Sequence, residues 1–237
     1  MLTNPIWQAL TSHQQALAQG DTLARAFPAS ISPLAGIAHP SPEAFAALAA
    51  LPDAERVRVL FMTEAMTDAP EGWQLTFGGP LVQMSLTAPD RLSPLTTPPE
   101  GFTLHTLTLA DVPEMLALTQ LTEPGPFETD TITLGRYIGL RTQHSGQLAA
   151  MAGERLRLPG YREVSAVCTH PDFQGQGLAA LLISDVARSI LARGETPFLH
   201  AWHANTGAIR LYEKLGFTHS NRLHVAALQL QPQAIPV

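Results

Sequence analysis

The chain is nearly free of cysteine, which excludes several classes of protein. Cys168 is the one cysteine among 237 residues, so no disulfide can form within the chain. A lack of disulfides is typical of proteins in reducing compartments. The sequence also contains no Cys/His cluster with zinc spacing and no EF-hand loop, so we expect no bound metal.

Long apolar segments are absent as well. No run approaches the ~20 apolar residues that a helix needs to cross a bilayer. The first residues, Met1 to Pro5, lack the basic segment and the following apolar stretch of a signal peptide. We therefore expect a cytoplasmic protein with no membrane partner.

Basic residues are in the minority. The chain has 14 Lys and Arg against 20 Asp and Glu, which gives a net charge of -6 at pH 7. Binding of nucleic acid needs a basic face, so no nucleic-acid partner is expected. With 45% hydrophobic residues the chain can bury a sizeable core, and its length allows one large domain or two small ones.

One stretch combines a strand, a glycine-rich turn and a helix. Residues Glu163 to Thr169 are mostly apolar and partly β-branched, as in a buried strand, and Pro171 ends that strand. Gly175 and Gly177 follow. A helix is then indicated by apolar residues that share one helical face, namely Leu178, Leu181, Leu182, Val186 and Ile190.

This order of elements suits the binding of an anion. The start of a helix leaves backbone N–H groups without partners, and glycine lets a phosphate approach the backbone. A P-loop is excluded because no Lys follows Gly177, and a dinucleotide fingerprint would need glycine where Ala180 stands. A phosphate-binding turn and a plain tight turn both stay open from these residues alone.

Two blocks resemble the GCN5-related N-acetyltransferase (GNAT) family. The run Gln174-Gly175-Gln176-Gly177-Leu178-Ala179 matches the family's Q/R-x-x-G-x-G/A signature. The segment from Asn205 to Phe217 is similar to the family's N-x-x-A-x-x-L-Y-x-x-x-G-F block. The run from Gly160 to Pro171 resembles the FR47-like branch, and the likeness covers about residues 101 to 230. It implies an α/β fold of the α+β type, with a mixed central sheet flanked by helices.

The resemblance implies acetyl-CoA as the cofactor. Its pantetheine arm is expected along the backbone of Val167, Cys168 and Thr169, where a backbone N–H would also be the oxyanion donor. Asn205 is expected to cap its helix and to touch the cofactor. The pyrophosphate is expected at the backbone amides of Gln174, Gly175, Gln176, Gly177, Leu178 and Ala179. The family often has Arg where Gln174 stands, so phosphate binding is expected to be weaker here.

Tyr212 is the predicted general acid. It matches the family's tyrosine, and a phenol with a pKa of ~10 can return a proton to a thiolate leaving group. The alternative is an aromatic residue that only packs in the core, at helical spacing with Ile209 and Leu215.

Glu163 is the predicted general base. It shares strand parity with Val167 and Thr169, so its carboxylate could face the acceptor, unless a β-bulge before Pro171 reverses the parity. The alternative is a solvated carboxylate at the end of a strand, with the base supplied by His170 or His203. No His/Asp partner pattern supports Cys168 as a nucleophile, and the family usually transfers the acyl group directly.

A proline-rich connector, Pro89 to Pro99, suggests two parts of the chain. We expect an N-terminal α/β region at 1–97, either a degenerate GNAT-like half or an oligomerisation surface, and a GNAT domain at 98–237. The alternative is a surface loop inside one domain. Segments with patterns of their own are a helix from Pro5 to Leu17, a helix starting at Ser41, a strand from Val57 to Met62, a hairpin or two short strands within Trp73 to Leu86, and a second GNAT helix from Thr131 to Gly139.

These features predict an acetyl-CoA-dependent N-acyltransferase that moves an acetyl group directly to a primary amine of a small molecule or peptide. A second hypothesis is a catalytically silent module that binds coenzyme A or has a regulatory role. The presence of both Tyr212 and Asn205 favours the enzyme.

Overall fold

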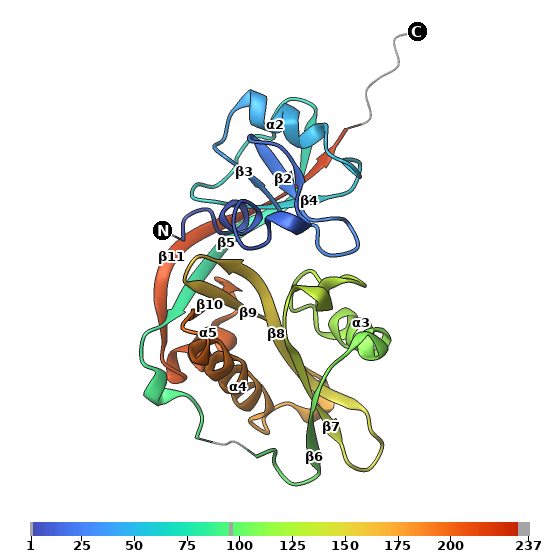
Figure 1. The fold of residues 1–237 in the computed structure, drawn as a ribbon, viewed down its shortest axis with the longest axis vertical. Coiled ribbons are helices and arrows are strands. Elements are labelled where there is room, and N and C mark those ends of the chain that lie inside the picture. Colours follow the sequence, from blue (N-terminus) through green and yellow to red (C-terminus); the bar gives the residue numbers. More distant parts are fainter. Residues whose placement is uncertain (1, 95–96, 232–237) are drawn as a thin grey trace.

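A computed structural model describes residues 2–94 and 97–231, and its centre is an eight-stranded mixed sheet (Figure 1). In chain order its strands are β4 (Arg58–Met62), β5 (Trp73–Leu86), β6 (Phe102–Thr106), β7 (Tyr137–Thr142), β8 (Leu148–Leu158), β9 (Tyr161–Thr169), β10 (Thr196–Trp202) and β11 (Phe217–Leu230). They lie in the order β4-β11-β5-β10-β9-β8-β7-β6. β9 and β10 run parallel and the other neighbours run antiparallel, so the predicted mixed α/β fold is confirmed.

Helices and a small second sheet complete the fold. The small sheet contains β1 (Gln19–Gly20), β2 (Ala24–Ala26) and β3 (Ala35–Ile37). The helices are α1 (Pro5–Leu10), α2 (Pro42–Ala49), α3 (Val112–Thr122), α4 (Leu178–Ala192) and α5 (Thr206–Lys214). Short 3₁₀ turns are η1 (Gln15–Leu17), η2 (Pro89–Arg91), η3 (Leu109–Asp111), η4 (Thr131–Leu134) and η5 (Pro171–Phe173). Among the described residues, no helix has the length and apolar character to span a membrane.

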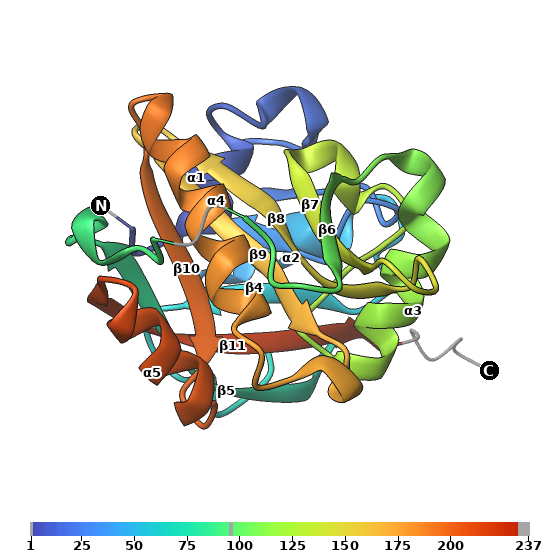
Figure 2. The same ribbon diagram turned by 90° about the horizontal axis from the view of Figure 1, so that it is seen from below.

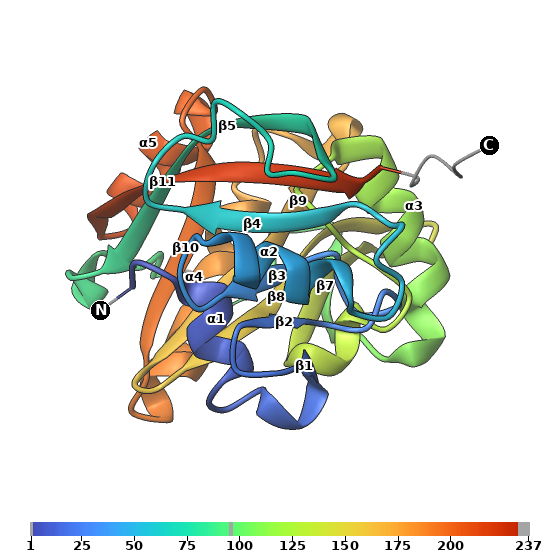
Figure 3. The ribbon, with the colours of Figure 1, turned by 90° about the horizontal axis from the view of Figure 1, so that it is seen from above.

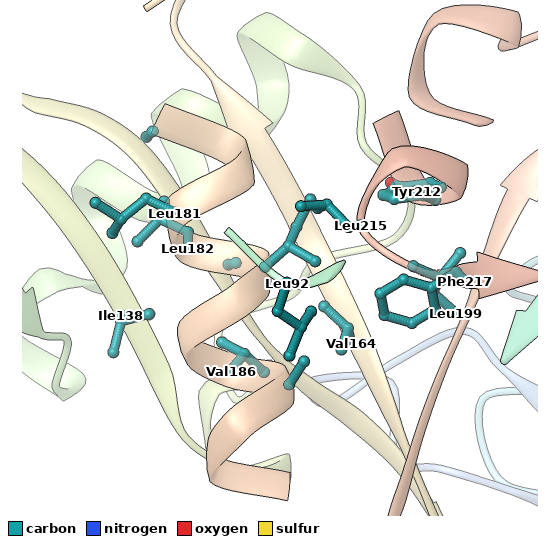
Figure 4. Packing of buried hydrophobic residues seen from close by; sticks show 14 of the residues in the cluster. Leu92, Ile138, Val164, Leu181, Leu182, Val186, Leu199, Tyr212, Leu215 and Phe217 are labelled. Carbon is teal, nitrogen blue, oxygen red and sulfur yellow. The ribbon is translucent and has the colours of Figure 1, made fainter. Parts of the chain in front are cut away.

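Helices α3 and α4 pack on the central part of the sheet, which contains β8 and β9 (Figure 2). The apolar face of α4 contributes Leu182, Val186 and Ile190 to a core that includes Val164 of β9 and Leu199 of β10. Figure 4 shows this core extending to Tyr212 of α5. α3 packs in a different cluster, with the C-terminal half of β9. Each helix thus buries apolar area against its own part of the sheet, which stabilises the fold.

The N-terminal region supplies two strands of the central sheet. β5 lies between β10 and β11, and pairs with β11 in 13 residue pairs and with β10 in five (Figures 1 and 3). β4 pairs with the other edge of β11. The border predicted near residue 97 therefore separates strands of one sheet. Residues 95 and 96 of the predicted connector lie outside the described residues.

Several elements differ from the sequence predictions. Trp73 to Leu86 forms one long strand instead of a hairpin, because Gly78 and Gly79 have no positive φ and β11 is long enough to pair with the whole segment. The predicted second GNAT helix is only the turn η4, because the backbone is extended at Gly135 and β7 begins at Tyr137. The helix predicted from Pro5 to Leu17 ends at Leu10, and a separate turn, η1, follows.

Ser41 caps α2 as predicted, accepting a bond from the backbone N–H of Ala44 at 3.2 Å.

Candidate functional site

Strands β9 and β10 separate part of the way along the sheet. Their parallel pairing covers three residue pairs and ends at Phe198 and Glu163. Beyond this point β9 continues to Thr169 with β8 as its strand partner, while β10 continues beside β5. We call this divergence the fork. Within the described residues, the β10-facing edge of β9 from Val167 to Thr169 has no strand partner, so its backbone groups are available to an extended ligand.

A β-bulge lies in β9 just beyond the start of the fork. Register with β8 shifts between Ser165 and Cys168, and Ala166 has a positive φ of 50°. As a result, Val164 packs in the core under α4 whereas Ala166 and Cys168 pack against α3, although all three have the same parity. The predicted sharing of one face by Glu163 and Val167 is therefore wrong, since the bulge reverses the parity between them.

The glycine-rich turn follows the end of β9 and leads into α4. Gly175 and Gly177 both have φ of +76°, and nothing lies within 4 Å of a Cβ built at either position. Residues 174–177 are exposed, and the backbone N–H groups of residues 175–177 donate to no acceptor in the described chain. With the free N–H groups of the first turn of α4, they form an open group of donors that suits a phosphate.

Asn205 and Tyr212 both belong to α5. The Asn205 side chain caps the helix, as predicted, because its Oδ1 accepts the backbone N–H of Ala208 at 3.1 Å. Tyr212 is buried, and its ring lies 6.2 Å from that of Phe217 (Figure 4). Burial raises the pKa of Tyr212 to about 12, so its hydroxyl stays protonated at neutral pH. Tyr212 thus packs in the core and also keeps the proton that a general acid needs.

Glu163 is buried completely at the start of the fork. Its two carboxylate oxygens accept four hydrogen bonds: Arg155 Nε at 2.8 Å, Arg155 Nη2 at 2.7 Å, the backbone N–H of Leu156 at 3.2 Å and His200 Nδ1 at 2.7 Å. A carboxylate has about four lone-pair sites, so none is left for a substrate proton. Burial alone would raise the pKa of Glu163, but Arg155 and His200 lower it to about 2.

His200 continues this cluster across the sheet. Asn221 Nδ2 donates to Gln83 Oε1 at 2.7 Å, so the Gln83 amide nitrogen is the atom that faces His200 Nε2, at 2.9 Å. His200 Nε2 therefore accepts, and its Nδ1 carries the proton that is donated to Glu163. The resulting chain of hydrogen bonds joins β9, β10, β5 and β11.

The surroundings of Glu163 and Cys168 bear on the roles predicted for them. Glu163 is buried, so it is not a solvated carboxylate at the end of a strand. Its catalytic role stays a prediction, but the four hydrogen bonds that its carboxylate accepts favour a structural role. The Cys168 thiol is buried beside α3, and burial raises its pKa to about 11, so it holds its proton and is a poor nucleophile. His170 Nδ1 accepts the backbone N–H of Asp172 at 3.3 Å, while His203 is exposed.

Arg155 and His200 were not predicted from the sequence. Arg155 and Leu156 together oppose the single residue Glu163, because the β8–β9 register shifts between Glu154 and Arg157. A regular hairpin about Gly160 would have placed Leu156 opposite Glu163 and Arg155 one residue further along. The sequence did contain one indication of this ion pair. Arg and Glu residues occur on both sides of the predicted turn at Gly160, so charges of opposite sign would face each other across the hairpin.

Replacement of Glu163 should destabilise the protein strongly. Glu163→Gln leaves Arg155 buried without its counter-charge, which typically costs about 3–5 kcal/mol. The native pKa lies below the unfolded value, so the carboxylate contributes stability above about pH 4.5, and this is lost as the pH falls towards 2. Urea unfolding from pH 7 to 3 should show the parent losing about 2 kcal/mol more than the variant, because the native carboxylate is still mostly ionised at pH 3. Equal pH dependence in the two proteins would contradict the assigned ion pair.

A shallow depression lies between α3 and the start of β8. Its volume is about 240 Å³, and His170 at the end of β9 forms part of its rim. Glu114 and Leu121 of α3 and Gln147 are among its other lining residues. It lies on the α3 side of the fork and offers a second surface to which a ligand could bind.

Comparisons with known proteins agree with this geometry. Residues 137–225 match the model of the FR47-like protein family, a range that includes the fork, the glycine-rich turn and α5. A protein from Novosphingobium aromaticivorans that is assigned to the GNAT family of acetyltransferases is 36% identical, with a TM-score of 0.84, 98% of this chain covered and 99% of that one. No significant match is found among curated proteins.

More distant structures share the fold. A GCN5-related N-acetyltransferase from Kribbella flavida is 19% identical, with a TM-score of 0.60 and 93% of each chain covered. A GCN5-related N-acetyltransferase-like protein from Streptococcus suis is 16% identical, with a TM-score of 0.56, 90% of this chain covered and 82% of that one. Taken with the nearly full-length match at 36% identity, the fork and the glycine-rich turn establish that the chain belongs to the GCN5-related N-acetyltransferase family, with an FR47-like domain.

Proposed function

We propose that the protein is an acetyl-CoA-dependent N-acetyltransferase that transfers the acetyl group directly to a primary amine. The observation that carries the proposal is the fork. Beyond it, β9 continues without β10 to Thr169, and a turn with unpaired backbone N–H groups follows. The unpaired edge of β9 suits the pantetheine arm of coenzyme A. The start of α4, where glycines leave the backbone N–H groups open, suits its pyrophosphate. The open space over Gly175 and Gly177 fits a pyrophosphate.

Each step of the transfer has a candidate group in this chain. Acetyl-CoA would supply the acetyl thioester. The backbone N–H groups of Val167 and Thr169, which alternate with the N–H groups that face β8, would hold the arm and polarise the carbonyl oxygen. Tyr212 holds a proton on Oη that it can give to a leaving thiolate. Glu163 is the base predicted from the sequence, but its carboxylate already accepts four hydrogen bonds. His170, His203 and water are the other candidates for accepting the amine proton.

The acceptor is proposed to be a small-molecule amine or a peptide amine. The net charge of -6 is compatible with a cationic acceptor. Direct transfer is supported by the buried, protonated thiol of Cys168, which leaves no activated cysteine for a covalent intermediate.

Two measurements test the proposal. Acetyl-CoA at 100 times its Kd should raise Tm by roughly 5–10 °C, because it binds only the folded state. With a panel of primary amines and peptides, the protein should release thiol from acetyl-CoA and form an equal amount of acetylated amine. Binding without turnover on any acceptor would favour the silent coenzyme A-binding module, and no binding would reject both.

Tyr212→Phe should lower kcat on the order of 10²-fold, because it removes the proton that is given to the leaving sulfur. The Kd for acetyl-CoA should change little, since the ring stays in the core. Tyr161→Phe is the matched control, because Tyr161 lies at the opposite end of β9, and it should leave kcat unchanged. Equal kcat for Tyr212→Phe and the parent, when chemistry limits the rate, would assign Tyr212 to core packing alone.

A further inference from the structure

One buried side chain of the N-terminal region, that of Gln14, bonds the strand β8 opposite the start of the fork. Gln14 lies in the turn between α1 and η1 and is buried although it is polar. Its Nε2 donates to the backbone oxygen of Arg155 at 2.7 Å, and its Oε1 accepts the backbone N–H of Arg157 at 3.1 Å. Both ends of the amide are therefore bonded to the backbone of β8.

Gln14 takes this position where β7 has ended. β7 pairs with β8 up to Tyr137 and Gly153, and the next N–H of β8, from Glu154, still donates to the oxygen of Arg136. In a regular strand the next N–H on this edge would be that of Leu156, but the bulge turns that N–H to Glu163. The Gln14 amide instead bonds the oxygen of Arg155 and the N–H of Arg157. The Gln14 amide thus replaces one further residue of a neighbouring strand.

The stretch of β8 that Gln14 holds is the bulge opposite Glu163. A bulge leaves an additional residue whose direction the strand pairing does not fix, and here that residue is Arg155. Arg155 binds both oxygens of Glu163, at the last residue pair before β9 and β10 separate. Gln14 bonds the backbone at Arg155 and two residues beyond it, so it limits where the guanidinium can lie.

We propose that Gln14 is a positioning residue for the transfer site. It fixes the bulge at Arg155, which sets the cluster of Arg155, Glu163 and His200 at the point where the fork opens. The position of that point determines where the free edge of β9 from Val167 to Thr169 begins. This inference rests on the proposed function, since it takes the fork as the place where the acetyl group is held. It makes the N-terminal region part of the site.

Gln14→Met tests the proposal in the full-length protein. Methionine has a similar length but forms neither hydrogen bond, and Gln15→Met is the matched control because Gln15 is exposed in the same turn. Two readouts need no turnover: amide hydrogen exchange of Leu156 and Arg157, whose N–H groups bond Glu163 and Gln14, and the NMR signal of the His200 Nδ1 proton. The third readout is kcat and KM for acetyl-CoA. If Gln14→Met does not fold, Gln14→Glu, which keeps the acceptor for Arg157, takes its place under the same criteria.

The proposal predicts a specific pattern. Amide exchange at Leu156 and Arg157 should accelerate about tenfold or more, and the His200 signal should shift or broaden. In addition, kcat should fall on the order of tenfold, with KM for acetyl-CoA changed less. A lower Tm with Leu156 amide exchange and a His200 signal equal to those of Gln15→Met would overturn the proposal. If the parent transfers no acetyl group, the proposed function fails, and the exchange and NMR results still decide whether Gln14 sets the fork.

Discussion

Gly177→Glu should abolish the rise in Tm that acetyl-CoA causes in the parent. The substitution places a carboxylate among the open N–H donors before α4, where the pyrophosphate is proposed to lie. Like charges in direct contact cost several kcal/mol, so the Kd should rise about 10²-fold or more. Isothermal titration of the purified variant with acetyl-CoA measures this loss directly.

The control for this variant is Gly160→Glu. Gly160 has φ of +77° and open space around it, so glutamate there carries the same charge and a similar backbone strain of about 1–2 kcal/mol. It lies in the β8–β9 turn, at the end of β9 opposite to the glycine-rich turn. Both variants should lose similar stability, but only Gly177→Glu should lose binding. Normal binding by Gly177→Glu would remove the phosphate site from this turn.

Residues 98–237 should not fold when they are produced alone. Without β5, the long strand β11 and the strand β10 both lose the neighbour that lies between them. Their unpaired edges and the apolar residues under them, such as Leu199 and Phe217, would be exposed to water. Circular dichroism and thermal unfolding of the fragment should show no cooperative transition.

Complementation provides the control for the fragment. Residues 1–97 produced together with 98–237 should restore a complex that co-purifies and unfolds cooperatively, because β4 and β5 can dock against β11 again. A cooperative transition of 98–237 by itself would instead support two separate domains with a border near residue 97.

Local patterns in the sequence predicted the core of the candidate site. The order of strand, glycine-rich turn and helix is visible because β-branched residues, Gly175 and Gly177, and the apolar face of α4 each act over short distances. The cap at Asn205 likewise depends only on the next three residues. Such elements are set by neighbours in the chain, so the sequence reveals them directly.

Features that depend on distant segments were not predicted. The sequence offers no local sign that β5 enters between β10 and β11, because strand pairing joins residues more than 100 positions apart. The two bulges, at Arg155 and Ala166, each shift a register by one residue, which is enough to bring Arg155 to Glu163 and to turn Glu163 and Val167 to different faces. Gln14 and Arg155 are 141 residues apart in the sequence, so their contact required the fold.

A crystal structure of the protein with coenzyme A tests the central claim most directly. The proposed function predicts pyrophosphate oxygens about 3 Å from the backbone nitrogens of residues 175–179 and a pantetheine arm along Val167 to Thr169, with its sulfur near Tyr212 Oη. Coenzyme A bound elsewhere at saturating concentration, for example in the depression between α3 and β8, would contradict it.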